Sequence, residues 1–315
     1  MATLVTGAGL IGTAFAAHAI ARGETILFLD PEPRADFLRR KLGPEGYALA
    51  RKDVRDLPAL VEAIKAHAID QVVHTAGLIG GRVQQSLSLG FDINLGGTRN
   101  VAEAVRLTGV RRLVHISTFG VYDRDRPAER PIDEDFPRGG ARAYGAYKAA
   151  KELILGAYSA AYGFELIMLR PANVFGLGHF WSGSSGGQKM QALLEAGLDK
   201  KPARIASAET MANEYIYAKD LGRAVDLALT APMPPEQVFN IGNGVVTSFA
   251  EVIDTVKALF PALQVEIEPG EPPKSKGQPL DISRAKRRLG WEPRFSLRAA
   301  FEDYLAEMKK GRAES

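Results

Sequence analysis

The sequence predicts an α/β fold, in which a doubly wound parallel sheet is followed by a smaller C-terminal region. Two observations support this prediction. Short apolar runs alternate with segments of helical apolar spacing through the first half of the 315-residue chain, a pattern typical of βαβ units. After Arg170-Pro171 the alternation loosens and the apolar runs become shorter and less regular.

The alternating elements of the first half build the sheet in order. Right-handed crossovers between parallel strands place helices on both faces, which gives the Rossmann arrangement. The predicted strands are Thr3–Thr6, Thr25–Asp30, Tyr47–Ala50, Gln71–His74 and Arg112–Ser117, with Glu165–Leu169 as a less regular sixth. The predicted helices are Ile11–Ala21, Ala35–Leu42, Leu57–Ala68, Ile93–Leu107 and Ala143–Ala161.

We divide the chain into residues 1–170, the Rossmann domain, and residues 171–315, mainly a discontinuous cap with some segments that return to the sheet. Such a cap lies over the carboxyl ends of the strands, where open α/β sheets bind ligands. Its predicted strands are Arg204–Ala206, Val238–Ile241 and Gln264–Ile267, and its helices are Asp220–Leu229, Phe249–Phe260, Ile282–Leu289 and Leu297–Met308. The glycine- and serine-rich stretch Gly176–Gly187 predicts a loop.

Composition argues against several classes of function. The 40 basic and 37 acidic residues give a net charge of only +3, which does not favour a nucleic-acid partner. The sequence has no cysteine, and its five histidines lack metal-ligand spacing, so we expect no metal site. No uninterrupted apolar stretch is long enough to span a membrane. We therefore expect a cytoplasmic protein with a small-molecule substrate.

The first strand leads into Gly7-Ala8-Gly9-Leu10-Ile11-Gly12, which fits the G-x-G-x-x-G pattern at the start of a helix. Glycines allow backbone N–H groups to approach a pyrophosphate, and the helix N-terminus favours its charge. A plain strand–helix turn is the alternative. Asp30 ends the second strand and can bind the adenosine ribose, which favours NAD over NADP, although the nearby Arg34 can soften this preference.

Tyr144 and Lys148 are four residues apart, so they share one face of the predicted helix. A free tyrosine has a pKa near ~10, too high for a base at neutral pH. A neighbouring ammonium and an oxidised nicotinamide both favour the phenolate. The spacing therefore suits a proton-transfer pair, although a chance pair on an amphipathic helix has the same pattern.

Several further segments resemble the NAD-dependent epimerase/dehydratase family, the extended branch of the short-chain dehydrogenases/reductases. Ser117–Tyr122 resembles the family's S-S/T-x-x-V-Y segment, Asn94–Thr98 its N-x-x-G-T segment, and Arg170–Gly176 its R-x-x-N-V-[YF]-G segment. Asp53-Val54, His74–Gly77, Tyr215–Asp220, Phe239–Gly242 and Leu289–Trp291 match further landmarks. The matches run in order from Thr3 to about Tyr304, nearly the whole chain.

This resemblance implies roles for particular residues. Thr118, Tyr144, Lys148 and Asn94 are the implied catalytic residues, and Tyr144 is the acid/base for a substrate hydroxyl. The implied cofactor-binding residues are Gly7, Gly9, Leu10, Ile11, Gly12, Asp30, Asp53, Val54, Thr75, Ala76, Gly77, Asn94, Tyr144, Lys148, Pro171, Asn173 and Val174. The substrate candidates are Gly80, Arg82, Thr118, Phe119, Asn173 and His179. A homodimer through the two long helices is a further expectation from the family.

Three departures from the family pattern bear on function. The glycine loop is one residue shorter than the usual T-G-x-x-G-x-x-G. Phe119-Gly120 stands where 4,6-dehydratases have Asp-Glu, which argues against dehydration. Asn213 and the segment Glu271–Lys274 stand where nucleotide-sugar enzymes place arginines for the substrate diphosphate. The absence of these arginines argues against a nucleotide-linked sugar, although Lys274 or Lys276 can substitute.

We therefore predict an NAD-dependent oxidoreductase that takes hydride from a hydroxyl-bearing carbon of a sugar, sugar acid or similar small polyol. An epimerase of a sugar or nucleotide sugar uses the same residues and is the main alternative. A non-enzymatic NAD-binding regulator on the same fold is a third interpretation.

Overall fold

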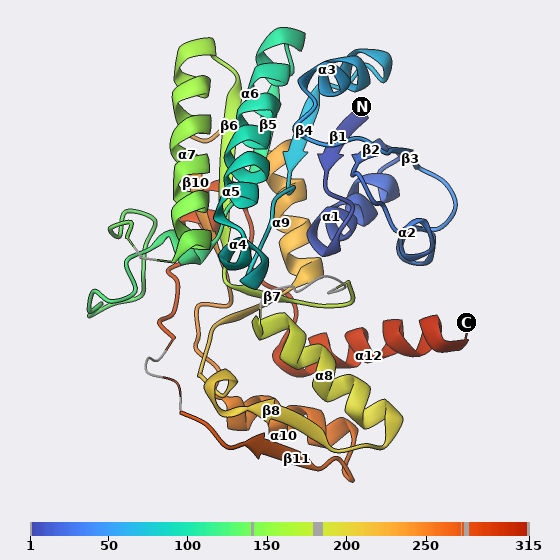
Figure 1. Cartoon of the computed structure of the whole chain (residues 1–315), viewed down its shortest axis with the longest axis vertical. Helices are drawn as coiled ribbons and strands as arrows, with labels where there is room; N and C mark the ends of the chain where they lie inside the picture. The colour runs from blue at the N-terminus through green and yellow to red at the C-terminus, as the bar shows by residue number, and fades with distance from the viewer. Residues whose placement is uncertain (1, 140–141, 179–184, 272, 274–276, 314–315) are drawn as a thin grey trace.

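The computed structural model describes residues 2–139, 142–178, 185–271, 273 and 277–313 (Figure 1). Its centre is a seven-stranded parallel sheet in the order β10-β6-β5-β4-β1-β2-β3. The doubly wound fold class is confirmed. The strands are β1 Ala2–Thr6, β2 Thr25–Leu29, β3 Tyr47–Ala50, β4 Gln71–His74, β5 Arg112–Ile116, β6 Glu165–Pro171 and β10 Val238–Ile241.

Helices cover both faces of this sheet because its buried strands alternate their side chains between two cores. Val5 and Phe28 belong to the core beneath α1 and α9, whereas Leu4 and Leu27 belong to the core beneath α3, α6 and α7. The bounds of these helices are α1 Leu10–Ala21, α3 Leu57–Ala66, α6 Gly97–Thr108, α7 Ala143–Tyr162 and α9 Ala218–Thr230. Helices α2 (Ala35–Leu42) and α11 (Ser283–Leu289) pack beside α1 and α9, respectively.

A second group of elements has its own core, which contains Phe175, Met190 and Phe301. It lies below the sheet in Figure 1, at the end where α7 begins. Its elements are α8 Ser185–Asp199, β8 Ala203–Ala206, α10 Phe249–Leu259, β11 Val265–Glu268 and α12 Leu297–Ala313. The short parallel pair β7 (Asn173–Phe175) and β9 (Tyr215–Tyr217) connects this group to the end of β6. Because β10, α9 and α11 return to the sheet, the division at residue 170 remains an interpretation.

The structure corrects three local predictions. Gly176–Gly187 is not a loop throughout, since α8 already begins at Ser185. The predicted helix Ile93–Leu107 is two elements, a π-helix η1 over Phe91–Gly96 that leads into α6. Elements that were not predicted include α4 (Gly81–Gln85), α5 (Leu87–Gly90), and the 3₁₀ turns η2 (Phe119–Val121) and η3 (Ser207–Glu209). Among the described helices, none is long and apolar enough to cross a membrane.

Candidate active site

The candidate site forms where the parallel strands of the sheet end. Strands β1, β4, β5 and β6 all run in the same direction, so the turns that follow them meet at one edge. These turns carry Gly7–Gly12, Thr75–Gly77, Ser117-Thr118 and Pro171–Val174. The four stretches are the ones that the sequence pattern assigns to the cofactor and the reacting group.

The glycine loop after β1 forms a tight turn, although it has one residue fewer than the usual family pattern. Gly7 has a φ of +95° and donates its N–H to Leu29 O at 2.9 Å. A Cβ on Gly12 would lie 2.5 Å from Gly7 O, so the helix can approach the loop only with glycine there. Helix α1 begins without a side-chain cap, which leaves N–H groups of its first turn free of side-chain acceptors. These features fit a pyrophosphate.

Asp30 lies at the end of β2, beside this loop. Its Oδ2 accepts a hydrogen bond from Ala8 N at 2.9 Å, and its Oδ1 accepts one from Glu32 N at 2.8 Å. The carboxylate is partly exposed, so it has remaining lone pairs for ribose hydroxyls. Arg34 is an exposed residue at the start of α2. The placement fits a dinucleotide without a 2′-phosphate.

Asp53 and Val54 follow β3 and border the N-terminal half of α6. Val54 is buried against Gly97, where a Cβ would lie 2.6 Å from its Cγ2, and it fits a wall for an adenine ring. Asp53 forms an ion pair of 2.7 Å with Arg55, and the hydrogen bond from that arginine lowers the pKa of the carboxyl. The side chain of Asp53 is therefore already engaged by its neighbour.

Tyr144 stands on the first turn of α7, next to Thr118. The Thr118 hydroxyl lies near enough to the phenol to lower its pKa. Gly120 N donates to Thr118 Oγ1 at 3.1 Å, which leaves the threonine hydrogen for the phenol oxygen. Burial raises the pKa of Tyr144 to about 12, and the Thr118 hydroxyl opposes that rise. The helix comes this close because a Cβ on Gly145 would lie 2.4 Å from Gly120 O.

Lys148 lies one turn further along α7 and is buried. Its Nζ donates to Ile116 O at 2.6 Å and lies 5.9 Å from the ring centroid of Tyr144. Burial lowers the pKa of this lysine to about 8. The ammonium thus stands between the end of β5 and the phenol, within reach of a ligand at the same edge.

The same helix contains a second pair at this spacing, Tyr147 and Lys151. Tyr147 donates its hydroxyl to Leu87 O at 2.7 Å, on the side covered by α5. Its phenol therefore points away from Thr118, and the structure favours Tyr144 as the reactive tyrosine. Lys151 is fully buried and donates to Ala76 O at 2.9 Å.

Asn94 belongs to the π-helix η1, a rare element that is frequent at functional sites. Its Nδ2 donates to Leu78 O at 3.2 Å, whereas its buried Oδ1 has no partner among the described residues. Across from it, Gly77 has a φ of +155°, and a Cβ there would lie 2.4 Å from Asn94 Oδ1. The turn after β4 thus carries an unsatisfied acceptor, as expected of a site that waits for a ligand or water.

A buried ion pair holds α7 against the sheet. Arg170 on β6 reaches Glu152 through two bonds, Nε to Oε1 at 2.9 Å and Nη2 to Oε2 at 2.6 Å. Ser117 donates to the same carboxylate at 2.5 Å, and burial of Glu152 is offset by these donors, so its pKa stays below the ordinary value. Ser117, the residue before Thr118, therefore ties the end of β5 directly to α7.

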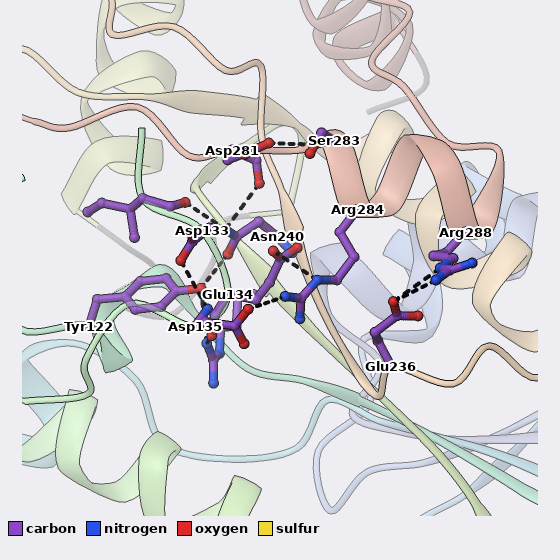
Figure 2. A network of polar contacts seen from close by, with 12 residues as sticks. Tyr122, Asp133, Glu134, Asp135, Glu236, Asn240, Asp281, Ser283, Arg284 and Arg288 are labelled. Atoms are coloured by element: carbon purple, nitrogen blue, oxygen red, sulfur yellow. Dashed lines mark hydrogen bonds and ion pairs between the residues drawn. The ribbon is translucent and has the colours of Figure 1, made fainter. Parts of the chain in front are cut away.

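The ion pair continues into a polar network around Asn240 of β10. Arg170 donates to Tyr122 Oη at 3.0 Å, and Tyr122 donates to Asn240 Oδ1 at 2.6 Å. Figure 2 shows Glu134 between Asn240 and Arg284, with distances of 2.9 Å from Asn240 N and 3.3 Å to Arg284 Nε. The network joins the segment after β5 to β10 and α11.

The predicted substrate residues differ in their exposure and do not all lie at the strand ends. Gly80 and Arg82 lie at the start of α4, and both are exposed to solvent. Phe119 is partly buried beneath Arg124, whose Cζ lies 5.1 Å from its ring centroid. Asn173 donates from Nδ2 to Glu214 O at 3.0 Å. His179 lies outside the described residues, as do Lys274 and Lys276.

The sequence analysis missed a buried lysine beyond Asn173. Lys189 on α8 donates its Nζ to Glu209 O at 2.6 Å and lies 5.6 Å from the ring centroid of Tyr215. Gly186, one turn earlier on the helix, borders Asn173. The hydroxyl of Tyr215 is buried and has no hydrogen-bond partner among the described residues. In the sequence, Lys189 is a single lysine after a glycine-rich stretch, so no pattern predicts its contacts with Glu209 and Tyr215.

Fold and site together define a dinucleotide-binding α/β architecture with a tyrosine, a threonine and a lysine at its ligand-binding edge. The chain belongs to the NAD dependent epimerase/dehydratase family, which it matches over residues 3–242. The family expectation from the sequence is thus confirmed.

Among its relatives, a UDP-glucose 4-epimerase from Mycolicibacterium smegmatis is 32% identical over 94% of this chain and 95% of its own. A dTDP-4-dehydro-6-deoxy-D-allose reductase from Streptomyces bikiniensis is 27% identical over 95% and 94%. A Thermus thermophilus UDP-glucose 4-epimerase, solved in complex with NAD, has a TM-score of 0.85 and 27% identity and covers 98% and 99%. The similarity therefore includes both an epimerase and a reductase.

The two tyrosines on α7 allow a matched test of the site. We expect Tyr144→Phe to cut turnover by roughly 10²–10⁴-fold, because the substrate hydroxyl loses its proton acceptor. Cofactor affinity should stay within a few-fold. Tyr147→Phe is the control, with the same atom removed from the outer side of the helix, and it should retain turnover. Steady-state rates and cofactor titrations measure both. Full activity in Tyr144→Phe would exclude it as the acid/base.

Proposed function

We propose that the protein is an NAD-dependent epimerase that inverts a hydroxyl-bearing carbon of a nucleotide-linked sugar. The arrangement of Thr118, Tyr144 and Lys148 carries this proposal, because a phenol near a hydroxyl and an ammonium at the strand ends suits proton transfer next to the dinucleotide loop. The UDP-glucose 4-epimerase relative, at 32% identity over almost the full length of both chains, supports the substrate class.

In the proposed reaction, Thr118 donates to or accepts from the reacting hydroxyl and holds it against the Tyr144 oxygen. Tyr144 accepts the hydroxyl proton as the substrate is oxidised and returns a proton when it is reduced again. Lys148 stabilises the phenolate and binds the nicotinamide ribose. NAD, when bound, supplies the redox chemistry by accepting hydride and giving it back. The protein supplies geometry, proton transfer and charge.

The cofactor is proposed to be NAD rather than NADP. Asp30 presents a carboxylate at the end of β2, which would repel a 2′-phosphate and can bind a free 2′-hydroxyl. The uncapped start of α1 and the close contact between Gly12 and Gly7 provide the pyrophosphate site. The proposed nicotinamide end lies near Thr75–Gly77 and Asn94.

The substrate's diphosphate needs a cation, and Asn213 does not supply one. Lys189 is a candidate replacement, since among the described residues its buried ammonium donates to the neutral Glu209 carbonyl. Burial lowers the pKa of Lys189 to about 8, so an anionic ligand would favour its charged form. The proposal places the sugar near Tyr144 and the phosphates toward α8.

A net dehydrogenase or reductase acting on a sugar, sugar acid or similar polyol is the second candidate. Asn213 in place of an arginine favours it, because a substrate without phosphates needs no such cation. The reductase from Streptomyces bikiniensis, at 27% identity, supports this second candidate. The catalytic residues are the same for both reactions, so they cannot separate the two.

An assay with NAD-loaded protein tests the proposal directly. We expect UDP-glucose and UDP-galactose to interconvert without accumulation of NADH. Lys189→Met should raise the KM for the nucleotide sugar by roughly 10–100-fold, the loss expected for a hydrogen bond to a charged group. Lys201→Met, an exposed neighbour beyond α8, is the control. Stoichiometric NADH formed from a free sugar or sugar acid, with UDP-sugars inert, would contradict the epimerase.

A homodimer is also proposed, through the face formed by α5, η1, α6 and α7. Figure 1 shows α6 and α7 side by side along one edge of the molecule. Large apolar side chains remain exposed on this group of elements, which is unusual for a free surface. They are Leu87, Leu89, Phe91, Leu107, Leu153 and Tyr162, each between 40% and 63% exposed.

A charge on this face tests the dimer. We expect Leu153→Glu to convert the protein into a monomer, because its side chain is 63% exposed on α7 and would bury a carboxylate in the interface. Val245→Glu is the control, since Val245 is 59% exposed but follows β10. Sedimentation equilibrium measures both masses. A wild-type monomer, or equal effects of the two substitutions, would refute the interface.

A further inference from the structure

Glu214 is a buried carboxylate that the proposed reaction does not use. It stands directly before β9 and is only 4% exposed. Its Oε1 accepts a hydrogen bond from Gly244 N at 2.7 Å, and its Oε2 accepts one from Leu280 N at 2.6 Å. Burial raises the pKa of this carboxyl to about 7, and backbone N–H groups oppose the rise. Burying a carboxylate on backbone donors alone is costly, so its presence calls for an explanation.

The side chain of Glu214 joins two segments that are distant in sequence. Gly244 belongs to the loop after β10, and Leu280 ends the stretch 277–280. A Cβ on Gly242 would lie 2.0 Å from Glu214 Oε1, so that loop can approach the carboxylate only with glycine there. Both oxygens of a carboxylate accept hydrogen bonds, whereas a glutamine amide presents a donor at one of the two positions. A glutamate can therefore hold both segments at once, and a glutamine cannot.

The backbone of Glu214 holds Asn173, one of the predicted ligand-binding residues. Glu214 O accepts hydrogen bonds from Asn173 N at 3.1 Å and from Asn173 Nδ2 at 3.0 Å. A Cβ on Gly186 would lie 3.1 Å from Asn173 Oδ1, so the amide oxygen borders the first turn of α8. Glu214 thus fixes both the backbone and the amide of Asn173 beside that helix.

The next residue, Tyr215, borders the same helix. Its ring centroid lies 5.6 Å from Lys189 Nζ, and its carbonyl oxygen accepts a hydrogen bond from Asn243 Nδ2 at 2.8 Å. Asn243 precedes Gly244 in the loop that the Glu214 carboxylate holds. The loop after β10 is therefore bound to Glu214 and Tyr215 together, and the two neighbours of Glu214 at α8 are Asn173 and Tyr215.

We propose that Glu214 is a positioning residue for the phosphate end of the substrate site, where it fixes Asn173 and Tyr215 beside Lys189. The inference rests on the proposed function, which directs the substrate phosphates toward α8. Without an acceptor for both Gly244 N and Leu280 N, the loop and the stretch 277–280 no longer hold the start of β9 in place. Binding groups need supporting contacts of this kind, because displacements of about 0.5 Å already weaken a site.

Steady-state kinetics of the NAD-loaded enzyme with UDP-glucose test this role. A pH of 7.5 lies between the pKa of Glu214, about 7, and that of Lys189, about 8. For Glu214→Gln we expect the KM to rise roughly 3–10-fold, the effect of one lost hydrogen bond. The kcat and the affinity for NAD should stay within about two-fold, because the side-chain contacts of Glu214 lie away from Tyr144 and the glycine loop.

A second variant separates geometry from charge. Glu214→Asp keeps both acceptor oxygens but is one methylene shorter, so it cannot reach Gly244 N and Leu280 N together. It should raise the KM as Glu214→Gln does. Asp220→Asn is the matched control, because Asp220 is also a buried carboxylate that accepts two backbone N–H groups, from Arg294 at 2.9 Å and Phe295 at 3.0 Å. It should leave the KM unchanged.

A double-mutant cycle with Lys189 distinguishes positioning from a general loss of structure. If Glu214 acts through the groups beside Lys189, then Glu214→Gln should change the KM less than about two-fold once Lys189→Met is present. A protein that is merely destabilised would lose the same factor in both backgrounds.

A wild-type KM in both Glu214 variants would overturn the proposal, as would parallel losses in kcat and NAD affinity or full additivity with Lys189→Met. The wild-type enzyme distinguishes the two levels of the argument. If it interconverts UDP-glucose and UDP-galactose while the Glu214 variants keep its KM, only the role of Glu214 fails. If UDP-sugars are inert with the wild type, the proposed function fails, and the role of Glu214 fails with it.

Discussion

The chemistry that we propose for this protein depends on the charge that surrounds one phenol, that of Tyr144. Burial raises the pKa of Tyr144 to about 12 even though the nearby Thr118 hydroxyl lowers it, which leaves the group protonated at neutral pH. The Lys148 ammonium and a bound oxidised nicotinamide would act in the opposite direction. Lys148 is itself buried, its Nζ donates to the Ile116 carbonyl, and among the described residues no carboxylate forms a salt bridge with it. Its charge is therefore available to the phenol and to a ligand.

That arrangement requires α7 to lie at a fixed rotation and depth against the sheet. The buried pair of Glu152 and Arg170 provides the constraint, and Ser117 extends it to the strand that carries Thr118. Removing one member of such a pair typically costs about 3–5 kcal/mol, since the remaining charge stays buried. Tyr122 and Asn240 belong to the same network, so these residues of the family pattern serve to build the site rather than to perform its chemistry.

The sequence predicted the sheet well, because fully buried parallel strands leave clear apolar runs between helices. It could not choose between Tyr144–Lys148 and Tyr147–Lys151 by spacing alone, since both pairs have four-residue separation. The choice depends on how Gly145 lets α7 approach Gly120, which is a packing property. The sequence resolved the choice only through resemblance.

Other parts of the site were beyond the sequence for different reasons. The burial of Lys189 depends on α8, which begins at Ser185 inside a stretch whose glycines predicted a loop. A lysine in a helix is usually exposed to solvent, so the sequence gives no sign that Lys151 is buried and donates to Ala76 O. Both residues are charged groups in unexpected interiors, and such exceptions to ordinary patterning are where functional constraint is expected.

The most direct measurement of the central claim is the ionisation of Tyr144 itself. Ultraviolet difference titration of wild type against Tyr144→Phe isolates the tyrosinate absorbance of this residue, with and without NAD. The account predicts that NAD binding moves the ionisation from about 12 to below the ordinary tyrosine value of ~10. A phenol that still ionises near its cofactor-free value when NAD is bound would contradict it.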